Sequence, residues 1–532
     1  MEEWHLTESD LKKYPHFDPL ISAKDAEALA TDADRVAKHA FYPFMLYPQR
    51  WTRFAEKGNT GKVKKRPIRY AARRDAYIFS YYRHLLSQKY EAELKSLGLD
   101  TSVLAYRRIP VADGQGGKCN IHFAHEAISK IRELGDCCVI ALDISSYFES
   151  LDHIKLKGLW CRMLGVTRLP ADHFHVFEAI TQYAEVDKEK TYERLGHFGA
   201  KRTTNTGKLI NGYLTPYNKM PKHLCKGKDF QDTIAGGNGD KTIIRKNYKP
   251  FGIPQGAPIS DLLANLYLVD FDNIVAGWAR DAGGAYYRYS DDILIVVPGN
   301  EVKGRSLMMR TRDLIKQFGD KLVIKEEKSS LFVLETYGDG QKCQLLHGKQ
   351  GKNGLEYLGF RYDGQRVYLR DATLSNLRRK VTRAAYREAT TYARRYPDKN
   401  TSQLKALTNY ERLIKQFGRV EDFGETQHDY RKWTFWTYAT KASEVFGPLG
   451  RPILRQLRKH RTSIKHRVDK SLEHAVAQRE KRKANGSATK QRIPPILAGP
   501  TDHVGNSGVG ASFRVADDRD GAAHGRCRGD GK

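Results

Sequence analysis

The segment 285–297 reads AYYRYSDDILIVV and sets two acidic residues between two apolar stretches. Residues 285–289 have the composition of a strand, and the β-branched run 293–297 has that of a buried strand. A connection this short predicts a hairpin with Asp291 and Asp292 at its turn. Taken alone, an Asp-Asp pair is a weak signal, because a solvated turn accounts for most such pairs.

A second apolar run, residues 138–142 (CVIAL), ends at Asp143. It is typical of a buried strand whose carboxyl end presents an acid. One strand-end acid and one acidic hairpin turn can build a two-metal site, in which three carboxylates hold two Mg²⁺ ions about 3.5–4 Å apart for in-line phosphoryl displacement. We therefore predict that Asp143, Asp291 and Asp292 converge on two Mg²⁺ ions, with Mn²⁺ as the alternative.

A glycine-containing turn lies between these acids in the sequence. The segment 251–272 reads FGIPQGAPISDLLANLYLVDFD, in which the turn around Gln255 and Gly256 precedes leucines at helical spacing. A glycine turn at the start of a helix lets the backbone and a Gln amide approach a nucleotide closely. This segment strengthens a nucleotide-binding interpretation of the acidic residues.

The composition favours a nucleic-acid partner. The chain has 532 residues, with 91 Lys and Arg against 62 Asp and Glu, a formal net charge of +29. So many positive charges repel one another unless a polyanion is bound. We therefore expect nucleic acid as the first partner and an anionic membrane as the second. The start is polar and no apolar run approaches the roughly 20 residues that cross a bilayer, so we expect a soluble, cytoplasmic protein without a membrane partner. The seven Cys include no C-x-x-C pair, which argues against a zinc ribbon.

Three motifs, in this order, resemble the palm motifs of reverse transcriptases: LDISSYFESLDH (142–153), GIPQGAPISDLLANLYL (252–268) and YSDD (289–292). Upstream, KVKKRPIRYAARRDAYIFSYY (62–82) resembles the fingers motif. Downstream, IKEEKSSLF (324–332) and LEYLGF (355–360) are similar to the lysine-bearing palm motif and the primer-grip hairpin. The resemblance covers about residues 60–365.

The resemblance implies an α+β fold of the right-hand polymerase type, with fingers, palm and thumb and an antiparallel palm sheet that carries the three aspartates. The groups it assigns to the metal ions are Asp143, Asp291, Asp292 and the Ile144 carbonyl. It makes Lys328 the candidate for protonating the leaving pyrophosphate, although a solvated lysine is an equal alternative. The residues that it assigns to the incoming nucleotide are Lys64, Arg66, Phe148, Gln255 and Gly256.

Phe148 bears on the product. It stands five residues after Asp143, where reverse transcriptases have an aromatic residue. A bulky ring there leaves no room for a ribose 2′-OH and so favours deoxynucleotides, whereas RNA-copying RNA polymerases usually place a polar residue there. The resemblance therefore predicts a DNA product and disfavours an RNA-dependent RNA polymerase.

The subtype is assigned by elimination. The RPI…D spacing and the YLGF ending resemble the bacterial lineage that includes group II intron, retron and defence-associated enzymes. The tail has a single Cys, without the Cys/His endonuclease module often found in intron proteins, and the Asn-Ala-x-x-His and Val-Thr-Gly strings of retron enzymes are missing. The chain thus resembles most the non-mobile, defence-associated reverse transcriptases once grouped as unknown, with intron-type and retron-type enzymes as alternatives.

We expect four regions along the chain. Residues 1–59 form an N-terminal lead-in, and 60–365 form the fingers and palm, with 186–250 as an insertion or mobile loop. Residues 366–480 form a helical thumb and RNA-binding region, and 481–532 a disordered basic tail. In the helical region, Arg451, Arg455 and Arg458 have helical spacing and predict a phosphate-facing stripe, unless they form a solvated face.

The expected function is Mg²⁺-dependent synthesis of cDNA from dNTPs on a structured RNA template. By analogy with the defence-associated enzymes, that RNA is encoded beside the gene and the activity serves antiphage defence. The alternative from another class is an RNA-binding platform or maturase with little polymerase activity, against which the intact acidic triad argues.

Overall fold

The computed structural model describes residues 3–52, 63–111, 116–202, 209–348, 353–418 and 434–490. The chain divides into two compact units. The first unit comprises Met1–Arg107, Cys137–Leu331 and Leu346–Lys349, and the second comprises Arg108–Asp136, Phe332–Leu345 and Gln350–Lys532. The chain therefore passes between the units within β10 (Ser330–Tyr337) and β11 (Gly340–His347).

Three antiparallel strands carry the acidic motifs of the first unit. They are β3 (Cys137–Asp143), β9 (Asp292–Pro298) and β8 (Ala285–Tyr289), with β9 between the other two. Residues 293–297 of β9 are all buried, as expected for a strand that is covered on both faces. These strands include both apolar runs found in the sequence, and they confirm the predicted hairpin and the mixture of helices with antiparallel strands.

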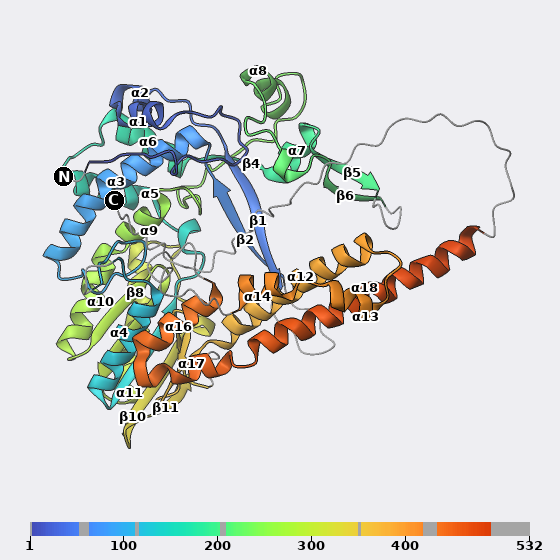
Figure 1. Ribbon diagram of the computed structural model, residues 1–532. Helices are drawn as coiled ribbons and strands as arrows, with labels where there is room; N and C mark the ends of the chain where they lie inside the picture. The colour runs from blue at the N-terminus through green and yellow to red at the C-terminus, as the bar shows by residue number, and fades with distance from the viewer. Residues whose placement is uncertain are drawn as a thin grey trace. The chain divides into compact units, whose positions relative to one another are not determined.

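Helices of the first unit bury the largest core of the molecule. The side chains of Trp160, Tyr82, Tyr90 and Phe271 are among its fully buried members. The long helix α3 packs against α5 and α9, and α5 packs against α9 (Figure 1). The helices that contribute are α3 (Arg73–Ser96), α5 (His153–Leu164), α6 (Ala171–Thr181), α9 (Ser260–Tyr267), α10 (Val269–Asp281) and α11 (Glu301–Leu314).

A second sheet of the first unit joins segments far apart in the sequence. Its strand order is β2 (Val63–Tyr70), β1 (Phe44–Thr52), β4 (Ala184–Asp187) and β7 (Arg245–Lys246). The pair β1 and β2 is long and antiparallel (Figure 1). β4 and β7 come from near the two ends of residues 186–250. Because β4 pairs with β1 and β7 pairs with β4, both ends of this region belong to the same sheet.

Residues 186–250, which we predict to be an insertion or mobile loop, include regular elements among their described residues. They contain α7 (Lys188–Arg194) and the hairpin β5 (Phe198–Arg202) and β6 (Leu209–Tyr213). Their core includes Val186, Tyr192 and Met220, which pack with Phe17 and Met45 from the start of the chain. The N-terminal lead-in, which also contains α1 (Ala23–Thr31) and α2 (Ala33–Ala37), thus completes the core of this region.

The second unit combines a small sheet with helices. Strands β12 (Leu355–Tyr357), β13 (Phe360–Tyr362) and β14 (Val367–Leu369) are antiparallel. Helix α4 (Asn120–Leu134) is tied to them because Asn120 donates hydrogen bonds to the Leu358 carbonyl and to the Tyr438 hydroxyl. The remaining helices are α12 (Asp371–Arg395), α13 (Thr401–Leu407), α14 (Tyr410–Phe417), α16 (Phe435–Phe446), α17 (Arg451–Gln456) and α18 (His460–Lys490).

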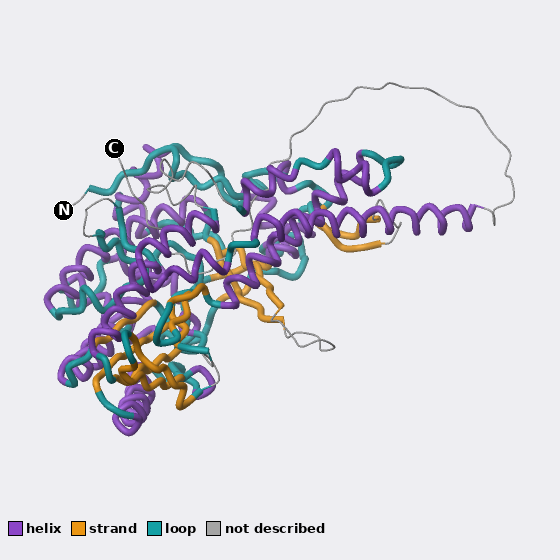
Figure 2. The backbone as a smooth tube through the Cα atoms, turned by 60° about the horizontal axis from the view of Figure 1, so that its bottom comes forward, coloured by secondary structure: helices purple, strands orange, loops and turns teal. Residues whose placement is uncertain are grey.

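Helices α12 and α18 lie side by side (Figures 1 and 2). The buried residues Val381, Ile464, Val468 and Leu472 lie on these two helices. Helix α18 continues to Lys490, ten residues beyond the expected start of the tail, and residues 491–532 of that tail lie outside the described residues. Across the described ranges, none of the helices combines the length and the apolar character needed to span a bilayer.

Candidate active site

The hairpin turn between β8 and β9 consists of Ser290 and Asp291, because Tyr289 pairs with Asp292. Ser290 has a φ of 62°, as the first residue of a type II′ turn does, although glycine is usual there. The turn is tied to β3, since the Ile144 amide donates to the Asp291 carbonyl at 2.9 Å. The β3–β9 register sets Asp143 opposite Asp292. All three predicted aspartates therefore lie at one end of the same strand pair.

Lys328 reaches this end of the sheet from a short 3-10 turn, Glu326–Lys328. Its ammonium forms an ion pair with Asp143, and both side chains are about one-third exposed. The preceding segment is held in place by a bridge between Ile144 and Ile324. The sequence-predicted Lys328 is thus next to the strand-end acid rather than solvated away from it.

The electrostatics connect four of the predicted site residues. Burial raises the pKa of the Asp291 carboxyl, and the negative charge of Asp143 raises it further. Arg66 and Lys328 act in the opposite direction on the same pKa. The net direction for Asp291 is upward, so its surroundings disfavour the ionised form of this carboxyl.

No group of three or more His, Cys, Asp or Glu side chains is arranged as a ready-made metal site within the described parts of the chain. The residues nevertheless fit a divalent cation. Asp143 already pairs with the positively charged side chain of Lys328. Burial first, and the charge of Asp143 second, raise the pKa of Asp291, and a cation would offset both effects. Carboxylates and a backbone carbonyl are the oxygen donors that Mg²⁺ prefers.

Three of the predicted nucleotide-side residues, Phe148, Gln255 and Gly256, lie at or beside the turn at 252–256. Phe148, in the 3-10 turn Tyr147–Glu149, is half-buried against the core, and its carbonyl accepts a hydrogen bond from the Ile253 amide at 2.8 Å. On the other side, the Arg69 amide donates to the Gln255 carbonyl at 2.9 Å. These bonds join the 3-10 turn, the glycine turn and strand β2.

Gly256 makes the contact with β2 possible. Its φ is +117°, and a Cβ at this position would meet the Arg69 carbonyl oxygen at 2.5 Å. Glycine is required there by both backbone conformation and space. Strand β2 also carries Arg66 and the backbone of Lys64, which pairs with Trp51; the Lys64 side chain lies outside the described residues.

The predicted phosphate-facing arginines belong to the second unit. Arg451 and Arg455 lie on α17, and Arg458 follows the end of that helix. All three side chains are exposed. The structure therefore leaves them accessible to a polyanion, while the small α17 contributes Ile453 to the unit's interior.

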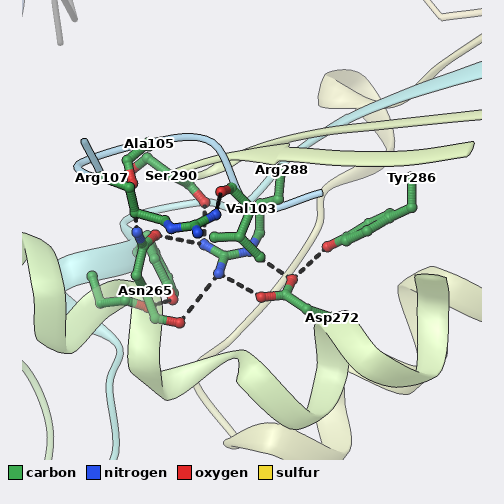
Figure 3. Close-up of polar contacts among 10 residues, drawn as sticks. Val103, Ala105, Arg107, Asn265, Asp272, Tyr286, Arg288 and Ser290 are labelled. Atoms are coloured by element: carbon green, nitrogen blue, oxygen red, sulfur yellow. Dashed lines mark hydrogen bonds and ion pairs between the residues drawn. The ribbon is translucent and has the colours of Figure 1, made fainter. Parts of the chain in front are cut away.

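Sequence reasoning missed the polar groups under the acidic turn, which Figure 3 shows. The buried Arg288 donates to Asp272, Asn265 and the Ser290 carbonyl. Tyr106 donates to the Ser290 hydroxyl at 3.0 Å, and burial raises the pKa of its phenol to about 12. The available signal was an arginine inside an otherwise aromatic strand, at 285–289, two positions before the turn.

Residues 183–362 match the family described as Reverse transcriptase (RNA-dependent DNA polymerase). This region therefore resembles the domain of an RNA-directed DNA polymerase, which is a nucleotidyltransferase. It contains the glycine turn, the acidic turn and Lys328, whereas Asp143 lies before its first residue. Enzymes of this family generally use divalent metal ions.

Solved structures of telomerase from Candida tropicalis are similar to the chain at low identity. An apo form truncated from the C-terminal domain is 10% identical, covers 66% of this chain and 61% of its own, and has a TM-score of 0.34. Another apo form is 12% identical, covers 87% of this chain and 73% of its own, and has a TM-score of 0.33. The chain thus spans less than two thirds of the first of them. No curated protein matches the chain.

Replacing Asp291 by Asn should raise the thermal stability of the metal-free chain. Because the folded-state pKa of Asp291 is raised, its ionised form destabilises the fold at neutral pH. We expect a melting temperature higher by roughly 1–3 °C at pH 7 in EDTA. The gain should shrink as the pH falls towards about 4, where the carboxyl is protonated in the unfolded chain as well.

The control is Asp281→Asn, which removes an exposed carboxylate from the same unit. It should leave the melting temperature unchanged at both pH values. A D291N chain that melts below the wild type at neutral pH would contradict the electrostatic description of the turn.

Proposed function

We propose that this chain is an RNA-directed DNA polymerase that makes cDNA from a structured RNA template by two-metal nucleotidyl transfer. One observation carries the proposal: strand-end Asp143, paired with Lys328, lies beside an acidic turn within a chain that contains a reverse transcriptase domain. The carboxylates of Asp143, Asp291 and Asp292, with the Ile144 carbonyl, would hold two Mg²⁺ ions, or Mn²⁺ as the alternative. Bound there, the ions supply charge neutralisation for phosphoryl transfer.

The chain's own side chains would bind and orient the nucleotide. Arg66 is close enough to Asp291 to affect its pKa, so its guanidinium can reach a triphosphate at the same place. Lys328 lies beside Asp143 at this end of the sheet with its side chain about one-third exposed, and it would give a proton to the leaving pyrophosphate. Lys64, Gln255 and Gly256 complete the proposed nucleotide-binding set.

The proposed product is DNA. The Phe148 ring is packed against the core on one side, so it has little freedom to move away from a sugar. Its backbone is fixed by the bond from Ile253, which belongs to the glycine turn. A ring held in this way can exclude a 2′-OH by steric contact.

We propose that segments of the chain correspond to the parts of a right-hand polymerase. The pair β1 and β2 would belong to the fingers, the β3, β9 and β8 strands to the palm, and the helices from α12 onward to the thumb and an RNA-binding region. The exposed Arg451, Arg455 and Arg458 would contact template phosphates. A net charge of +29 supports a large polyanionic partner.

For the biological role we propose antiphage defence in the bacterial cytoplasm, on a template RNA encoded beside the gene. The support is the resemblance of the motifs to defence-associated reverse transcriptases. A group II intron-like enzyme or maturase, a retron-type enzyme and an RNA-binding platform are the alternatives. The ion pair at Asp143 and the repulsion at Asp291 favour an enzyme, since a platform gains nothing from clustered carboxylates.

Changing Asp291 and Asp292 together to Asn should abolish dNTP incorporation. The amides keep the shape of the side chains but cannot neutralise two divalent cations, so we expect at least a 10³-fold loss of primer extension in Mg²⁺. RNA retention and the melting temperature should not fall. Asp281→Asn is the matched control and should extend primers normally. Extension by the double variant near the wild-type rate would remove the metal assignment.

Phe148→Ala should relax sugar selection. Without the ring, the 2′-OH of a ribonucleotide no longer meets a steric obstacle, so the ratio of rNTP to dNTP incorporation should rise roughly ten- to a hundredfold. The measurement is primer extension with each nucleotide class separately. Phe174→Ala, an exposed aromatic on α6, is the control and should leave the ratio unchanged. An unaltered ratio in the Phe148 variant would make that ring a plain core residue.

Arg451, Arg455 and Arg458 changed together to Ala should weaken RNA retention. Three fewer phosphate contacts should also reduce the slope of log affinity against log salt by about 2–3. The control changes Arg378, Arg383 and Arg387, three exposed arginines of α12, and so removes the same charge from the same unit. Equal losses in the two triple variants would show a general charge effect instead of a defined contact.

A further inference from the structure

We propose that Arg288 is a positioning residue for the reaction: it holds the Ser290–Asp291 turn in the conformation that presents Asp291 to the metal ions. The inference rests on the proposed function. It is drawn from the buried polar network of Figure 3, which links the turn to α9 and α10. Arg288 contacts neither substrate nor metal ligand side chain in this network, and it acts through the backbone of Ser290.

The first observation is the complete burial of an ion pair. The side chains of Arg288 and Asp272 are both 0% exposed. Arg288 donates from Nε to Asp272 Oδ1 at 2.6 Å and from Nη2 to Oδ2 at 2.5 Å. Tyr286 donates to the same Asp272 carboxylate at 2.6 Å. Burial alone would lower the pKa of Arg288, but the charge and hydrogen bonds of Asp272 more than offset it, so the pKa lies well above its usual value.

The second observation is what the rest of the guanidinium does. Nη1 donates to Asn265 Oδ1 and to the Ser290 carbonyl, both at 3.1 Å, and Nη2 donates to the Asn265 carbonyl at 3.2 Å. A fully buried guanidinium has N–H donors beyond those that bind the Asp272 carboxylate, and these need acceptors of their own. The planar guanidinium of Arg288 thus binds three groups at once: the Asp272 carboxylate, Asn265 and the backbone of the turn.

The third observation is that the turn needs such support. Ser290 has a left-handed φ of 62°, which is unfavourable for a non-glycine residue and persists only where the surroundings enforce it. The Ser290 carbonyl is bound by Arg288, and the following carbonyl, that of Asp291, is bound by the Ile144 amide. Two different partners, Arg288 and the Ile144 amide, thus hold the two peptide groups that set the direction of the Asp291 side chain.

The network also reaches the nucleotide side of the site. Asn265 lies on α9, the helix that starts four residues after Gly256, and its side-chain amide donates to the Ala105 carbonyl at 2.6 Å. Arg288 therefore ties the acidic turn to the helix that follows the glycine turn. Because this frame is fully buried, solvent cannot replace a lost contact within it.

The test compares Arg288→Lys with Tyr286→Phe in the full-length chain. A lysine can still pair with Asp272, but one ammonium cannot reach Asp272, Asn265 and Ser290 in the geometry of the fork. We expect kcat for dNTP incorporation in Mg²⁺ to fall roughly ten- to a hundredfold, with the KM for dNTP changed less than about threefold. Hydrogen–deuterium exchange of the metal-free chain should be faster at residues 288–294 and at the Ile144 amide.

Tyr286→Phe is the matched control, since it removes one bond to Asp272 and leaves the bond to the turn intact. It should lower the melting temperature while keeping kcat within about twofold and the exchange of the turn unchanged. If R288K does not fold, the paired variant D272N/R288Q leaves no charge unpaired and makes the same comparison.

The outcomes separate the two proposals. An inactive wild-type chain, on RNA and DNA templates alike, would overturn the proposed function. An active wild type with an R288K variant of equal kcat and equal exchange would overturn the role of Arg288 alone. A Y286F variant that loses as much kcat as R288K would also overturn it, because the effect would then follow stability and not the contact with Ser290.

Discussion

The antiparallel pairing of β3 with β9 is the constraint on which the candidate site depends. It sets Asp143 against Asp292 and leaves two residues for the turn that carries Asp291. A slip of one residue would exchange the two faces of β9 and would move Asp292 from its place opposite Asp143. Both strands are buried, so a changed register would also require the closely packed side chains around them to repack.

Around this pairing, separate segments contribute one group each. The bridge between Ile324 and Ile144 positions the segment that carries Lys328. Phe148 lies in the 3-10 turn after β3, and Arg66 lies on β2. The glycine turn connects the 3-10 turn with β2, because its backbone forms a hydrogen bond to each of these two segments. The site is therefore assembled by backbone contacts near strand ends, which hold the segments that carry its side chains.

The sequence predicted those features that depend on residues close together along the chain. The apolar β-branched runs close to Asp143 and Asp291 predicted the strands β3 and β9, and the glycine turn predicted that a helix, α9, follows it. It was less informative where distant residues meet. The polar composition of residues 186–250 hid a core that needs Phe17 and Met45, more than a hundred residues earlier in the chain. Likewise, an arginine in a strand is usually expected at the surface, and nothing local shows that Arg288 finds Asp272 on a helix 16 residues before it.

The unfavourable features of the site lie together in the Ser290–Asp291 turn, and this placement points to a function. Ser290 is held in a left-handed conformation, and burial with a neighbouring charge disfavours the ionised form of Asp291. A turn selected for stability alone would have glycine in the first position and no second acid beside the first. Both costs are local, and both fall on the residue pair that the buried network of Arg288 holds in place. Strain and repulsion kept together at a strand end are what a site needs when a positively charged ligand is to relieve them.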